Sequence, residues 1–287
     1  MKARDLLKKA KEKGVALGAF NVGNIETFKA IVQAAEKLRS PVLIEASPGE
    51  AAYIGFRQLV CLARAYEDKI QLPIILNFDH GDSVENIIEA IHAGFDYVHY
   101  DGSKFSYEEN IENACIVVEE AHKKDVVVEG EIDHIEGSSA DHTMENTQMY
   151  SRPELFTDPR KAQEFVARTG VDVFASFIGN LHGVYADQIH LNLDKLKAIS
   201  LAIPNTYLSL HGGSGVYDED IRNAVKMGIV KINVNSELRI AFKMTLQEDI
   251  SKTTEIAPYK YMKRPIEEVQ KVVESKMKLF GSPELLK

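Results

Sequence analysis

Three histidines share one sequence context, in which an apolar run ends and a glycine follows the imidazole. They are His80 in FDHGD, His182 in NLHGV and His211 in LHGGSG. Imidazole is the commonest protein ligand of zinc, and a catalytic zinc takes three protein ligands and keeps one position open for water or substrate. The following glycines let the backbone and a ligand come close. A lone histidine is more often a core or surface residue, but three in this setting predict a zinc site.

Carboxylates accompany these histidines. Asp79 directly precedes His80, where it could either orient a metal ligand or act as an unligated general acid/base beside the metal. Glu129 and Glu131 share one face of a predicted strand, and Asp101 ends the neighbouring strand. Carboxylates gathered in this way need cations or protons. The cluster therefore predicts either a second metal position or structural ion pairs.

One further histidine competes with the three. Strand alternation places His99 on the same side as Asp101. We interpret His99 as a structural residue of the barrel interior and not as a ligand.

The elements that must position these residues repeat one pattern, a β-branched run followed by an amphipathic helix. The charged N-terminal segment 1–14 is also helical in character. Eight such units can form an open doubly wound sheet or a closed barrel. The count, and the polar residues after nearly every run, favour a single-domain (β/α)8 TIM barrel over residues 1–287, in which all strand ends converge on one mouth. Strands are predicted at 15–22, 41–47, 72–78, 95–100, 126–132, 171–179, 206–210 and 228–234, and helices at about 25–38, 56–69, 83–93, 106–123, 158–169, 192–202, 217–227, 236–250 and 264–280.

Two loops have the composition of a phosphate site. HGGSG (211–215) and NVNS (233–236) follow the seventh and eighth strands, where barrels often bind phosphate through backbone N–H groups and a helix N-terminus. Any tight turn could use one GGSG. Two such loops, with Ser236 as the expected N-cap of the next helix, favour a phosphate site. The polar, non-periodic segment 133–157 is predicted to be a mobile active-site loop.

Composition limits the partners. The 287 residues include 34 Lys and Arg against 43 Asp and Glu, a net charge of −9, so no nucleic-acid partner is expected. No apolar run approaches the roughly 20 residues that cross a bilayer, and no signal peptide is recognisable, so no membrane partner is expected. Cys61 and Cys115 lie in apolar helical contexts and are expected to be buried in a reducing compartment. These features predict a cytoplasmic enzyme.

Taken together, the motifs resemble one family from end to end. The chain is similar to the class II, metal-dependent ketose-bisphosphate aldolases, which include fructose- and tagatose-bisphosphate aldolases. The resemblance is found in GAFNV (18–22), DHG (79–81), DGS (101–103), EGE (129–131), TDP (157–159), FVARTGVD (165–172), IG and HG (178–183), HGGSG (211–215), KINVNSELR (231–239) and FGS (280–282).

The resemblance implies a metal-dependent aldolase that cleaves a phosphorylated ketose, such as fructose 1,6-bisphosphate, to dihydroxyacetone phosphate and an aldehyde. It implies that His80, His182 and His211 bind the catalytic Zn²⁺, and that Asp79 is the acid/base facing the substrate's C4 hydroxyl. It implies that Asp101 and Glu131 hold a second divalent or monovalent cation, and that the protein is a homodimer or homotetramer. The residues that match the family's cradle for dihydroxyacetone phosphate are Gly183, Gly212, Gly213, Ser214, Asn233, Val234, Asn235 and Ser236.

Around this intact set, several positions depart from the family pattern. Asn77 stands where the family usually has histidine, Asn180 and Leu181 replace small residues, and Ala186 and Ile266 stand where lysine and arginine are common. These departures predict that fructose 1,6-bisphosphate is not the best substrate, with Lys263 and Arg264 as substitutes for the missing arginine.

Three alternative functions remain. Lys231 could form a Schiff base with a ketose, because alternation puts it on the strand face of Asn233. The chain could be a metal-binding barrel that has lost aldolase activity, or a metal-dependent hydrolase.

Overall fold

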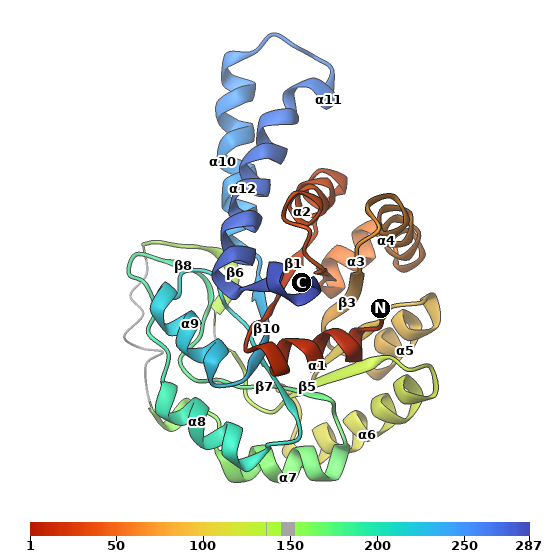
Figure 1. The fold of residues 1–287 in the computed structure, drawn as a ribbon, viewed down its shortest axis with the longest axis vertical. Coiled ribbons are helices and arrows are strands. Elements are labelled where there is room, and N and C mark those ends of the chain that lie inside the picture. The colour runs from red at the N-terminus through yellow and green to blue at the C-terminus, as the bar shows by residue number, and fades with distance from the viewer. Residues whose placement is uncertain (136, 145–152) are drawn as a thin grey trace.

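A computed structural model describes residues 1–135, 137–144 and 153–287 of the chain. Eight parallel strands close into a barrel in the order β1-β10-β9-β7-β5-β4-β3-β2 (Figure 1). The predicted single-domain TIM barrel is therefore confirmed. Its strands are β1 (Leu17–Asn21), β2 (Val42–Ala46), β3 (Ile74–Gly81), β4 (Tyr97–Asp101), β5 (Val127–Glu131), β7 (Val173–Ala175), β9 (Tyr207–Leu210) and β10 (Ile229–Val234).

Helices surround the barrel, and each of the predicted ones is present in the structure. Beyond the ring, α1 (Ala3–Lys13) closes the N-terminal end of the barrel, where its buried Leu6 and Leu7 pack in one cluster with inward residues such as Leu43 and Tyr97. The others are α2 (Ile25–Leu38), α3 (Pro48–Ile54), α4 (Phe56–Ile70), α5 (Val84–Ala93), α6 (Tyr107–Lys123), α7 (Pro159–Thr169), α8 (Leu193–Ala202), α9 (Asp218–Lys226), α10 (Ser236–Lys252), α11 (Pro258–Tyr261) and α12 (Lys263–Phe280), with 3₁₀ turns at Pro153–Leu155 and Ser282–Leu286.

Strand alternation separates two environments. Outward side chains such as Phe78 and Ile232 are fully buried in the apolar cluster under the helices. Inward side chains form an apolar layer near α1, and polar side chains follow it toward the carboxyl ends of the strands. This layering places the polar side chains inside the barrel, toward the end that is formed by the carboxyl ends of the strands.

The segment after β5 differs from the expected irregular loop. Gly137–His142 forms a short strand, β6, which pairs in parallel with β8 (His182–Tyr185) as a separate two-stranded sheet. Residues 136 and 145–152 of the predicted loop lie outside the described part of the chain. The strand predicted at 171–179 is also shorter, because the chain leaves the barrel after Ala175 and turns at Gly179, whose φ is +99°. His182 therefore begins β8 and does not end a barrel strand.

Two smaller expectations also need correction. Cys61 is exposed and Cys115 is half-buried, so neither is the buried thiol that was expected. The helix α3 was not predicted, although Ser47, Pro48 and Glu50 form the start signal of a helix: Glu50 accepts a hydrogen bond from the Ser47 N–H at 2.9 Å.

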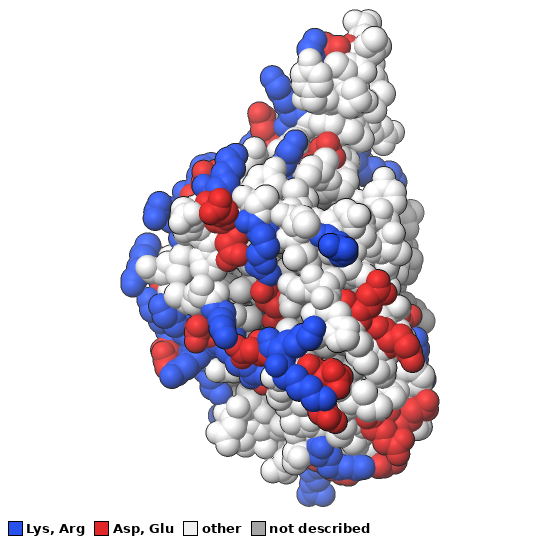
Figure 2. Space-filling view, turned by 90° about the vertical axis from the view of Figure 1, so that its right-hand side faces the viewer, with Lys and Arg blue, Asp and Glu red and all other residues white. Residues whose placement is uncertain are grey.

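The outer surface has two notable features. The helices α10 and α12 lie side by side and project from the barrel as an arm that ends at α11 (Figure 1). On the face in Figure 2, basic and acidic side chains are intermixed and the tip of the arm is largely uncharged. Among the described helices, none has the length and apolarity required to span a bilayer.

Candidate metal centre and active site

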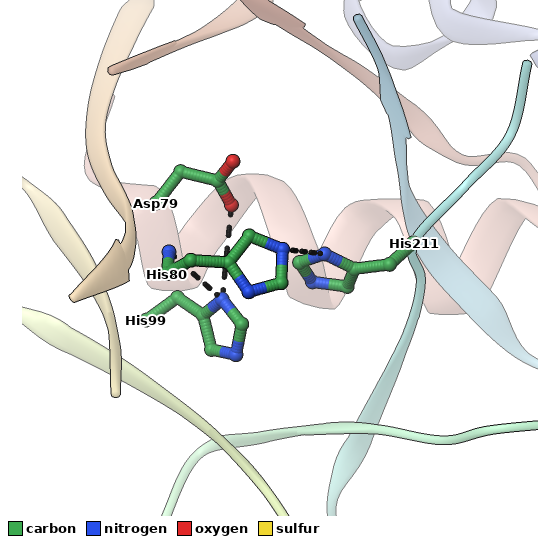
Figure 3. Close-up of side chains that lie close together, drawn as sticks. All are labelled: Asp79, His80, His99 and His211. Atoms are coloured by element: carbon green, nitrogen blue, oxygen red, sulfur yellow. Dashed lines mark hydrogen bonds and ion pairs between the residues drawn. The ribbon is translucent and has the colours of Figure 1, made fainter. Parts of the chain in front are cut away.

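The three predicted histidines converge at the mouth of the barrel. His80 comes from the end of β3 and His211 follows β9, and the Nε2 atom of His80 lies 3.0 Å from the Nδ1 atom of His211 (Figure 3). The ring centroid of His182 lies 5.0 Å from the ring centroid of His80 and 6.1 Å from that of His211. His80 adopts a φ of +50°, a conformation that a residue with a side chain rarely takes, and it holds the imidazole toward the other two.

Carboxylates fix which nitrogen of His80 and which nitrogen of His211 faces the centre. The Nδ1 atom of His80 lies 3.0 Å from the carboxylate of Asp101, and the Nε2 atom of His211 lies 2.7 Å from that of Glu129. An ionised carboxylate can only accept, so these two nitrogens carry the protons. The remaining nitrogens therefore present lone pairs to one another across 3.0 Å, an arrangement that requires a cation or a proton between them. The donor set thus fits a zinc ion.

The charges of the site agree with this fit. Burial, opposed by Glu129, lowers the pKa of His211 to about 3, and burial next to other imidazoles lowers that of His182 well below its ordinary value. Both rings are therefore neutral, as metal ligands must be. Burial also lowers the pKa of His80, but Asp79 and Asp101 outweigh it and raise that pKa. The surroundings of His80 consequently favour positive charge.

Asp79 lies at the edge of this centre as an ionised carboxylate. Its two oxygens accept hydrogen bonds from the side-chain amides of Asn21 and Asn233, each at 3.1 Å. Burial alone would raise the pKa of Asp79, but the charge of His80 and the contact with His99 hold it well below its usual range. The carboxylate is therefore unprotonated and able to accept a proton. Asp79 also lies within 4.8 Å of nitrogens of His80, His99 and His211, so the geometry allows ligation as well.

His99, which we interpreted as a structural residue of the barrel interior, lies next to the imidazoles of the candidate metal centre. It is fully buried, and its ring lies 4.6 Å from the rings of both His80 and His211. Its Nδ1 atom lies 3.7 Å from Asp79 and its Nε2 atom 3.5 Å from Glu131. Burial lowers the pKa of His99, but Glu129, Asp79 and Glu131 outweigh it and hold that pKa well above its ordinary value. Its alternation with Asp101 was the signal that pointed to this position.

Glu131 forms the second group of potential ligands together with His80 and Asp101. Within the described part of the chain, neither of its two buried carboxylate oxygens has a hydrogen-bond partner. Burial, and then the negative charge of Asp101, raise the pKa of Glu131 to about 8. This carboxylate therefore needs either a proton or a cation.

A separate ionic cluster lies below the mouth. Glu45 and Glu129 are fully buried and bind the Lys231 ammonium at 2.9 and 2.8 Å. The same pairing raises the pKa of Lys231 against the effect of burial. A Schiff-base lysine must be neutral and must reach the substrate. Lys231 meets neither condition, which argues against the imine alternative.

The mouth opens into one pocket beside the metal centre. Six of the eight residues assigned to the substrate cradle line this pocket. The other two, Gly213 and Val234, do not line it; the Gly213 N–H instead donates a hydrogen bond to the Asn233 carbonyl at 2.9 Å. Gly212 has a φ of +61°, and a Cβ there would lie 2.2 Å from the Leu181 carbonyl oxygen. The lining residues are Asn21, Asp79, His80, Ser139, His182, Gly183, His211, Gly212, Ser214, Asn233, Asn235 and Ser236.

The departures from the family pattern have structural roles. Asn180 accepts from the Ile178 N–H at 2.8 Å and donates to the His211 carbonyl at 3.1 Å, which ties the His182 turn to the His211 loop. Asn77 donates to Glu45 at 2.8 Å. Ala186 is exposed and outside the pocket.

The expected substitutes for the missing arginine do not reach the pocket. Arg264 binds Glu248 at 2.7 Å and also pairs with Asp249 on the arm, and neither Arg264 nor Lys263 lines the mouth. Ile266 packs at the edge of the apolar core.

Comparisons with known proteins show the family of this chain. The family model described as "Fructose-bisphosphate aldolase class-II" matches residues 1–284. This chain belongs to that family. A Bacillus subtilis (strain 168) protein named "Probable fructose-bisphosphate aldolase" is 38% identical over 284 residues, 97% of this chain and 96% of the relative. A fructose-bisphosphate aldolase of Staphylococcus aureus (strain Mu50) is 34% identical over 283 residues, again 97% and 96%.

A solved structure gives the same result. The crystal structure of the YdjI aldolase from Escherichia coli K12 superposes with a TM-score of 0.83 at 32% identity, covering 99% of this chain and 98% of that chain. Family membership supports aldolase activity, that of a carbon–carbon lyase acting on a phosphorylated sugar.

Proposed function

We propose that this protein is a zinc-dependent aldolase that reversibly cleaves a phosphorylated ketose, such as fructose 1,6-bisphosphate, to dihydroxyacetone phosphate and an aldehyde. Tagatose 1,6-bisphosphate or another phosphorylated ketose is an alternative substrate of the same site. The observation that supports this best is the convergence of three histidines, two of them oriented by carboxylates, next to the ionised Asp79. Neither a barrel without activity nor a hydrolase explains that base together with the family match.

His80, His182 and His211 would hold the zinc ion. Zinc bound there supplies a Lewis acid for the negative charge that develops on the ketose oxygen when the carbon–carbon bond breaks. Asp79 takes the proton of the C4 hydroxyl in the cleavage direction and returns it in condensation. Asn21 and Asn233 keep its two oxygens in place for this transfer.

The rest of the mouth is suited to the substrate. Ser214, Gly212 and Ser236 line the pocket next to the N-terminus of the 17-residue helix α10, which favours a phosphate group. Asp101 and Glu131 are proposed to hold a second divalent or monovalent cation, since the buried oxygens of Glu131 accept no hydrogen bond from the described residues. We also propose a cytoplasmic location, because phosphorylated sugars do not cross membranes unaided. A homodimer or homotetramer is proposed from the family resemblance.

Metal removal tests the proposal. Prolonged chelation is expected to abolish turnover and added Zn²⁺ or Co²⁺ to restore it, while borohydride in the presence of substrate leaves the enzyme active. An enzyme that resists chelation and is inactivated by borohydride would show that an imine, and not a metal, supports the reaction.

A further inference from the structure

The cation Lys231 lies inside the barrel, and the proposed chemistry does not use it. The side chain is fully buried, with Nζ at 2.9 Å from Glu45, 2.8 Å from Glu129 and 5.0 Å from the centre of the Tyr97 ring. Burying a charge is unfavourable, because the charge loses its hydration. The layer just below is filled by apolar side chains, so a lysine is not needed to fill this space.

Glu129 connects this cation to the metal centre. One of its oxygens binds the Lys231 ammonium and accepts a hydrogen bond from the Tyr97 hydroxyl. The other oxygen accepts hydrogen bonds from the Ser209 hydroxyl and, at 2.7 Å, from the Nε2–H of His211. The His211 ring consequently has its proton inside the barrel and its Nδ1 lone pair toward His80. The ring is also fully buried, so water cannot replace these contacts.

We propose that Lys231 is a positioning residue that acts through Glu129: its ammonium fixes the carboxylate that sets the tautomer and orientation of the metal ligand His211. The inference rests on the proposed metal function. The corresponding carboxylate of His80 does not need such a cation. Asp101 is partly exposed, and the backbone N–H and hydroxyl of Ser103 donate to it at 3.1 and 2.6 Å. Of these two ligands, the fully buried His211 is therefore the one whose carboxylate partner is bound by a cation.

The test measures zinc affinity by competition with a chelating dye, and does not use turnover. Lys231→Met is expected to weaken zinc binding about 10- to 100-fold, the usual effect of losing such a supporting group. In a Glu129→Gln background the same change should alter the dissociation constant less than about threefold, because the connection is already broken. Arg64→Met is the matched control: it removes a cation from Asp96 at the N-terminal end of the barrel and should leave zinc binding unchanged.

Lys231→Met leaves two buried carboxylates without their cation and could fail to fold. Comparing the single variant Glu45→Gln with the double variant Glu45→Gln/Lys231→Met reduces this risk. In the double variant, Glu129 is the only one of the two carboxylates that remains charged. Nitrogen NMR of the imidazoles gives a second readout that needs no metal: His211 should be protonated at Nε2 in the unmodified protein and lose this fixed tautomer with Lys231→Met.

The outcomes are distinct. Unchanged zinc affinity and an unchanged His211 tautomer without Lys231 would overturn the inference, as would effects of Glu129→Gln and Lys231→Met that simply multiply. An unmodified protein that binds no zinc would instead contradict the proposed function, and the NMR comparison would still test the role of Lys231.

Discussion

Asp79 is held between two amide side chains and an imidazole, and it is ionised although it is buried. A carboxylate held this way can serve as a base without binding the metal. The opposite possibility, ligation, is allowed by the distances. The two roles predict different behaviour when the carboxylate is replaced by an amide of the same shape.

Asp79→Asn is expected to retain zinc and to lose turnover about 10²–10⁴-fold, the usual effect of removing a general acid/base. Steady-state kinetics and zinc content of the purified variant are the measurements. Asp82→Asn is the control, since Asp82 lies three residues away, half exposed, and pairs with Lys104 at 3.5 Å. Loss of zinc together with activity would assign Asp79 as a ligand.

Among the elements outside the barrel, β6 and β8 contribute most directly to the pocket, because they supply its lining residues Ser139, His182 and Gly183. Arg239 of α10 links β6 to the opposite rim. One of its nitrogens donates to the Ser139 carbonyl at 3.0 Å and another binds Glu50 of α3 at 2.6 Å. Glu50 in turn accepts from Asn21, the partner of Asp79.

Arg239→Met should therefore loosen β6. We expect faster amide exchange over residues 137–142 and a rise in KM of roughly three- to tenfold, since a half-exposed ion pair contributes about 1 kcal/mol. Hydrogen-exchange mass spectrometry and steady-state kinetics measure the two effects. Arg222→Met removes a comparable arginine from the surface pair with Asp218 and should change neither. Equal exchange in both variants would show that Arg239 does not hold the strand.

At the scale of the whole molecule, the pocket formed by the described residues is lined by neutral groups, imidazoles and one carboxylate, without a lysine or arginine. A phosphate near α10 can be bound by neutral donors, but a second, distal phosphate has no charged partner there. We predict that fructose 1,6-bisphosphate is a weaker substrate than a ketose phosphate without that distal group or with another configuration. Kinetics on a panel of ketose mono- and bisphosphates decide this. A kcat/KM for fructose 1,6-bisphosphate well above all others would show that a cation from elsewhere, such as a neighbouring subunit, completes the site.

The arm bears on the oligomer. Helix α10 buries few of its side chains, and Met244, Ile250, Ile256 and Tyr259 are exposed on the arm, with Ile256 at 90%. Exposed apolar side chains gathered on a projection are typical of subunit contacts. We predict that light scattering shows a dimer or tetramer and that Ile256→Glu with Tyr259→Glu shifts the mass toward the monomer. Met144→Glu, at an equally exposed site in the turn after β6, is the control. A double variant with unchanged mass would exclude the tip of the arm.

The sequence alone determined the barrel and the family, and it named the residues that we propose for the chemistry. Alternation with period two and helical patterns repeated eight times indicate a strand followed by a helix regardless of contacts elsewhere. The glycines after His80, His182 and His211, and the carboxylate before His80, are equally local signals. These predictions therefore did not depend on knowing how the strands pair.

Only the tertiary structure decided the depth of each polar residue. Glu45 pairs with Asn77 in the next strand, and Asn77 pairs with Tyr97, so the stagger between strands sets which side chains share a layer. This stagger puts Glu45, Glu129 and Lys231 together below the mouth, where the ammonium binds both carboxylates. It also brings His99 beside the metal ligands. Alternation gives the side of a strand, whereas position along the barrel axis depends on register with neighbours far apart in the sequence.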